Sequence, residues 1–97
     1  MDADRTSRYT AYQTVQAIVK EYRGNKLHNN EADEILYAAE GMLLAKELTD
    51  EDAVLSRTSF DTLMADLCSY RWKDNAPSAE RLRAAFSACA PQPIAVI

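Results

Sequence analysis

The stretch that decides the fold is residues 31–48, which read EADEILYAAEGMLLAKEL. Wound as a helix at about 100° per residue, this stretch carries apolar side chains on two opposite faces. The first face consists of Ala32, Ile35, Leu36, Ala39, Met42 and Leu43, and the second consists of Tyr37, Gly41, Leu44 and Leu48. The core of a one-domain protein normally claims only one face of a helix. The segment is therefore either the central helix of the fold or a helix whose second face is kept for a partner.

A second helical pattern precedes this segment. It predicts a helix from Asp4 or Ser7 to about Arg23, and Gly24 follows as the left-handed residue that often ends a helix. The apolar stripe of this helix consists of Ala11, Tyr12, Val15, Ile18, Val19 and Tyr22. A short polar connection then leads to Asn29 or Asn30, the expected cap of helix 31–48.

The segment after residue 48 is predicted to form two helices separated by a break. Phe60, Leu63, Met64, Leu67 and Tyr70 share one helical face, whereas Val54 and Leu55 project away from it when the same helix is extended backward. This mismatch predicts a short helix at 50–56, begun at Thr49, and a longer one at 59–73, capped by Thr58 or Ser59. Their junction lies at residues 57–59.

A last helix is predicted at 77–90, because Pro77 is well placed in a first helical turn. Its common face consists of Ala79, Leu82, Ala85, Phe86 and Cys89. Pro91 and Pro93 then impose an extended path on an apolar tail, residues 91–97, which is expected to pack on its own domain or on another chain. The chain is thus expected to be all-α: one domain, residues 1–90, formed by a compact antiparallel bundle of four main helices plus one short helical turn.

Charge is distributed unevenly along the chain. Residues 31–66 carry ten acidic side chains against Lys46 and Arg57, and both flanking segments are mildly basic. A middle segment this acidic would repel the phosphates of a nucleic acid, so we expect no nucleic-acid partner. Neither a secretory leader nor a membrane-spanning run is recognisable, so a cytoplasmic location and no membrane partner are expected.

The strongest candidate site is the second face of helix 31–48. A glycine inside a helix costs about 1 kcal/mol relative to alanine, so Gly41 indicates close approach of another backbone. We expect a non-catalytic interaction or regulatory module that self-associates there as a homodimer or binds another protein. The interface would consist of Tyr37, Gly41, Leu44 and Leu48, with the two copies crossing at Gly41.

Two alternatives belong to other classes. The first is a small-molecule-binding domain with an apolar pocket between helices, rimmed by Tyr12, Tyr22, Met42 and Trp72. The second is a helix-turn-helix DNA binder built on the break at residues 57–59. It is the weakest alternative, because its recognition helix would carry Asp61, with Asp66 close by, and carboxylates repel the phosphates of DNA.

Catalysis and metal binding find little support in the sequence. Cys68 and Cys89 fall among apolar residues at helical spacing, and His28, the only histidine, is expected in an exposed loop or cap. We therefore expect no enzyme, no cofactor and no metal.

Overall fold

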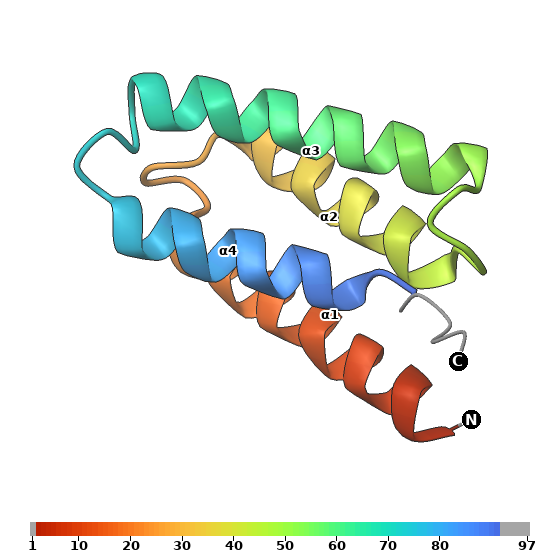
Figure 1. Cartoon of the computed structure of the whole chain (residues 1–97). Coiled ribbons are helices and arrows are strands. Elements are labelled where there is room, and N and C mark those ends of the chain that lie inside the picture. Colours follow the sequence, from red (N-terminus) through yellow and green to blue (C-terminus); the bar gives the residue numbers. More distant parts are fainter. Residues whose placement is uncertain (1, 92–97) are drawn as a thin grey trace.

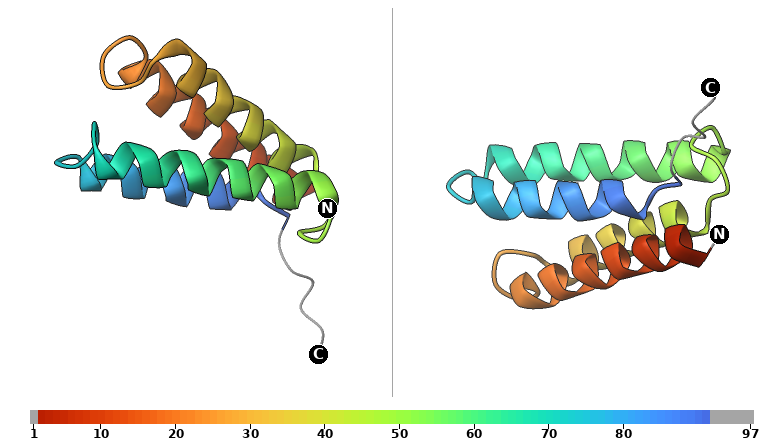
Figure 2. Two further views of the ribbon diagram at one scale, coloured as in Figure 1. Left: turned by 90° about the horizontal axis from the view of Figure 1, so that it is seen from above. Right: turned by 60° about the horizontal axis from the view of Figure 1, so that its bottom comes forward.

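Four helices form the chain in the computed structural model, which describes residues 2–91 and their side chains from Arg5 onward. They are α1 (Asp2–Tyr22), α2 (Asn29–Leu44), α3 (Glu51–Ser69) and α4 (Ala76–Cys89). α1 and α2 form one helical hairpin, and α3 and α4 form the other. Between the two hairpins, α2 packs on α3 and α1 packs on α4 (Figure 1). The α1–α2 pair is inclined to the α3–α4 pair (Figure 2). The predicted all-α antiparallel bundle is confirmed.

The core is built from the predicted stripes of all four helices, except that Tyr70, expected on the stripe of α3, is 82% exposed. Small side chains on α2 let its neighbours approach closely: Ala32, Ala38 and Ala39 are all buried. Between α3 and α4, the rings of Phe60 and Phe86 stack with centroids 3.8 Å apart. The largest fully buried side chains are Trp72, Phe60, Phe86, Ile18, Leu27, Ile35, Met42, Met64, Leu67, Leu82, Val15 and Val19.

The predicted break in the third helix is wrong. α3 runs without interruption through residues 57–59, so the expected short helix at 50–56 is its first part and Asp50 is its N-cap. Ala53 is buried seven residues before Phe60 and continues the core stripe backward. Val54 and Leu55 lie off that stripe because they are exposed, not because the helix changes direction.

Several predicted helix ends move by a few residues. α1 begins at Asp2, and Gly24 follows its end as a left-handed residue with a φ of 79°, as predicted. His28 is the N-cap of α2 in place of Asn29 or Asn30, so it is an exposed cap histidine as expected. Its backbone N–H donates to Glu31 Oε1 at 2.9 Å.

α2 ends at Leu44, four residues earlier than predicted, because long-range polar contacts replace the helical pattern there. Arg8 Nη2 lies 3.0 Å from the carbonyl oxygens of Met42, Leu43 and Ala45. Arg8 Nε also donates to the carbonyl of Cys89, the last residue of α4, at 2.9 Å. One guanidinium thus satisfies carbonyls at the C-terminal ends of two helices, where a cation is also favoured by both helix dipoles.

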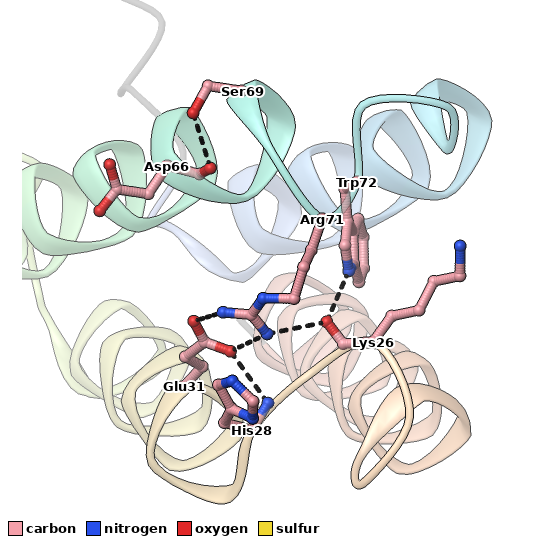
Figure 3. A network of polar contacts seen from close by, with 7 residues as sticks. All are labelled: Lys26, His28, Glu31, Asp66, Ser69, Arg71 and Trp72. Carbon is pink, nitrogen blue, oxygen red and sulfur yellow. Dashed lines mark hydrogen bonds and ion pairs between the residues drawn. The ribbon is translucent and has the colours of Figure 1, made fainter.

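The opposite end of the bundle is held by a second polar network (Figure 3). Arg71, after α3, pairs with Glu31 in the first turn of α2 and donates to the carbonyl of Lys26 at 3.3 Å. Trp72 Nε1 donates to the same carbonyl at 3.0 Å. The α3–α4 connection is therefore fastened to the α1–α2 connection. The tail expected at residues 91–97 lies, from residue 92 onward, outside the described residues.

Replacing Arg8 with alanine is expected to lower the free energy of unfolding by about 2–4 kcal/mol, because partly buried carbonyls lose a charged donor. Arg8→Lys should recover only part of this loss, since an ammonium lacks the planar fork of donors. Urea unfolding followed by circular dichroism measures both. Arg81→Ala, at an exposed site on α4, is the control and should change the value by less than about 0.5 kcal/mol. An Arg8→Ala protein as stable as the wild type would contradict this role.

The Glu31–Arg71 pair predicts a pH dependence of stability. The hydrogen bond from Arg71 lowers the pKa of Glu31 below its ordinary value of 4.5. The stabilisation is therefore complete above pH 4.5 and is lost as the pH falls through the lowered pKa. Glu31→Gln should cost about 1–2 kcal/mol at pH 7 and much less at pH 2. Urea unfolding at both pH values checks this, and an equal cost at both would contradict it.

Candidate functional site

The second face of α2 remains largely exposed in the folded chain. Tyr37 is 77% exposed and Leu44 is 73% exposed. Leu48 is exposed as well, but it lies in the turn after α2 and not on the helix. Although α2 packs on all three other helices, that packing does not bury these side chains. The sequence left open whether this helix is central or keeps one face free. In the structure α2 is central, and it still leaves apolar side chains exposed on its second face.

Gly41 differs from the other residues of the predicted interface because it packs against another helix of the same chain. A Cβ built on Gly41 would overlap Ser56 Oγ and would lie 3.4 Å from Ser56 Cβ, on α3. The close approach that a helical glycine indicates is therefore found between α2 and α3. This contact accounts for the glycine without a second copy.

Leu55 of α3 joins Tyr37 and Leu44 on this side of the molecule and is 58% exposed. Two hollows, of about 500 and 400 Å³, share Leu55 and Ser56 and together form one groove between α2 and α3. The groove, here called the α2–α3 groove, is lined by Asn30, Asp33, Glu34, Tyr37, Ala38, Gly41, Leu44, Ala45, Lys46, Asp50, Asp52, Leu55, Ser56 and Ser59. Sequence reasoning missed Leu55 as a site residue because its departure from the core stripe was interpreted as a helix break.

Charge around the α2–α3 groove is predominantly negative. Its lining contains Asp33, Glu34, Asp50 and Asp52 against a single cation, Lys46. Three of these carboxylates also act within the fold: Asp33 pairs with Arg23 at 3.0 Å, Glu34 Oε1 accepts a hydrogen bond from Ser59 Oγ at 3.2 Å, and Asp50 Oδ2 accepts the backbone N–H groups of Lys46 and Glu47. The groove therefore offers an apolar strip bordered by acidic groups.

The four residues predicted to rim a small-molecule pocket do not line a common one. Tyr22 and Trp72 are brought together, with ring centroids 4.9 Å apart, and Tyr22 Oη lies 2.6 Å from Ser78 Oγ. Trp72 and Met42 are both buried in the core. Tyr12 lines a separate surface hollow together with Leu36, Tyr37 and Glu40, among other residues. None of the pockets described here is lined by more than one of the four.

Groups suited to catalysis or metal binding are dispersed in the part of the chain that the structure describes. Cys89 is a buried free thiol whose pKa is raised to about 11, chiefly by burial, so its reactive thiolate form is disfavoured. Cys68 is a half-buried free thiol on α3. No group of three or more His, Cys, Asp or Glu side chains able to hold a metal is found among residues 5–91. No described helix is long and apolar enough to cross a membrane.

Comparison with known proteins adds no further assignment: no protein-family model, curated protein or solved structure matches the chain significantly. The helix-turn-helix alternative loses its structural basis, because α3 is continuous where the turn was expected.

The contact at Gly41 generates a prediction about stability. The double variant Gly41→Ala/Ser56→Ala should unfold with a free energy about 0.5–1 kcal/mol higher than that of Ser56→Ala alone, because alanine favours a helix and the clashing hydroxyl is gone. In the wild-type background Gly41→Ala should gain less, since Ser56 has to rotate. Thermal and urea unfolding of all four proteins give the coupling. Equal effects of Gly41→Ala in both backgrounds would contradict the contact.

Proposed function

We propose that this chain is a non-catalytic protein-interaction module whose binding surface is the α2–α3 groove. One observation carries the proposal: Tyr37, Leu44 and Leu55 stay exposed along a single groove although the bundle has a complete core. A cluster of exposed large apolar side chains rimmed by polar groups is typical of an interaction site. The cytoplasmic location expected from the sequence stays a prediction.

The proposed occupant is an amphipathic helix with basic flanks. A groove between two helices suits a third helix, which places its apolar stripe in the groove. The acidic lining favours Lys and Arg beside that stripe and steers their approach. The proposed partner is therefore another protein that offers a basic amphipathic segment.

Self-association is the second candidate occupant. An isologous dimer would place the same surface of two copies together. Across the α2–α3 groove this brings the acidic patches of the two copies, each with Asp33, Glu34 and Asp52, near one another, an arrangement that like charges disfavour at low salt. A dimer formed through this groove should therefore strengthen as salt is added, whereas binding of a basic helix should weaken.

The test uses two designed 16-residue amphipathic peptides with the same Leu and Ala stripe, one with Lys flanks and one with Glu flanks. The Lys peptide should bind the wild-type chain, and Leu55→Ser or Tyr37→Ser should weaken its affinity by about tenfold, as expected for a central anchor. Tyr70→Ser is the matched control, because Tyr70 is 82% exposed and lies outside the groove. Isothermal titration calorimetry measures affinity, and light scattering measures molar mass in parallel.

Each outcome decides one element of the proposal. Equal binding of both peptides would refute the role of charge. Binding unchanged by Leu55→Ser would refute the groove. If the wild-type chain is a dimer, binds neither peptide and is dissociated by Leu55→Ser, the occupant of the groove is a second copy of the chain and not a basic helix. A monomer that binds neither peptide contradicts the proposed occupant.

A further inference from the structure

A fourth hollow lies where α1 begins and α2 ends, next to the α2–α3 groove. It has a volume of about 740 Å³ and is larger than the others described here. Sites for small molecules typically measure roughly 300–1,000 Å³. The hollow, here called the α1–α2 end pocket, is lined by Arg5, Thr6, Arg8, Tyr9, Leu43, Leu44, Ala45 and Lys46.

The charge of this pocket is opposite to that of the α2–α3 groove. Three cations line it, and no described lining residue is acidic. Arg5 comes from α1 and Lys46 from the turn after α2, so the two charges approach the pocket from different elements. Both residues are exposed, and neither side chain makes an ion pair among residues 5–91. An anion in the pocket therefore meets positive charge that the described fold does not already use.

The C-terminal end of α2 would ordinarily repel an anion, because helix C-termini carry partial negative charge. Here Arg8 Nη2 lies 3.0 Å from the carbonyl oxygens of Met42, Leu43 and Ala45. These carbonyls face a guanidinium, so their negative ends are compensated. The structural role of Arg8 thus also makes the pocket compatible with a negative ligand.

Apart from Thr6, the remaining lining is apolar or aromatic. Tyr9 is 52% exposed, Leu44 is more exposed still, and Leu43 is half-buried and so less exposed than either. Bare inorganic anions would leave this surface uncovered. A ligand that joins an apolar chain to an anionic group would cover it and also meet Arg5 and Lys46.

We propose that the α1–α2 end pocket binds an anionic amphiphile, namely a single apolar chain that ends in a carboxylate. The carboxylate lies between Arg5 and Lys46, and the chain lies against Tyr9, Leu43 and Leu44. This proposal does not rest on the proposed function, since Arg5, Arg8 and Tyr9 lie outside the lining of the α2–α3 groove. Only Leu44, Ala45 and Lys46 belong to both linings.

The test compares three ligands with the same ten-carbon chain, below their micelle concentrations: decanoate, decanol and decyltrimethylammonium. NMR titration of the full chain gives both affinity and location. Decanoate should bind about fivefold more tightly than decanol at low salt, a preference expected of two exposed charge pairs. It should shift the amide signals of residues 5–9 and 43–46. Decyltrimethylammonium should bind more weakly than decanol.

Arg5→Ala/Lys46→Ala should remove the preference for decanoate over decanol. The matched control, Lys73→Ala/Arg81→Ala, changes two exposed cations elsewhere and should leave the preference intact. Circular dichroism confirms that each variant is folded. The proposal is overturned if decanoate fails to bind, if the first double variant keeps the preference, or if the shifts cluster around Leu55. Failure here with the Lys peptide still bound would leave the groove proposal standing.

Discussion

The structure depends most on the guanidinium of Arg8, which closes the end of the bundle where α2 and α4 finish. Two helix C-termini converge there, and their last carbonyls have no partner within the helices. Arg8 donates to carbonyls of both and places a positive charge at the negative ends of both dipoles. This contact fixes where α2 stops and directs the chain into the turn that Asp50 organises.

Between the polar networks at the two ends of the bundle, the size of the side chains differs between the inner and outer faces. Alanines on the inner face of α2, together with Gly41 against Ser56, let α3 approach closely. Tyr37 and Leu55 lie outside this close contact and remain exposed. The proposal that the groove binds a partner rests on this exposure of Tyr37, Leu44 and Leu55.

Much of the fold could be predicted from sequence, because the stripes of α1, α2 and α4 repeat at helical spacing and Gly24 marks a turn. Tyr37 and Leu44 could be found in the same way. Leu55 could not, since periodicity does not distinguish an exposed apolar residue from a change of helix direction. The end of α2 was also hidden, because Arg8 lies 34–37 residues from the carbonyls that it satisfies there. Local patterns carry no information about such a contact.

The central claim is that the apolar side chains of the α2–α3 groove do not contribute to folding. Urea unfolding of the triple variant Tyr37→Ser/Leu44→Ser/Leu55→Ser tests it most directly. The account predicts a free energy of unfolding within about 1 kcal/mol of the wild-type value, because exposed side chains lose little burial on truncation. A loss of more than about 3 kcal/mol, the cost typical of core truncation, would show that this face belongs to the core and would contradict the account.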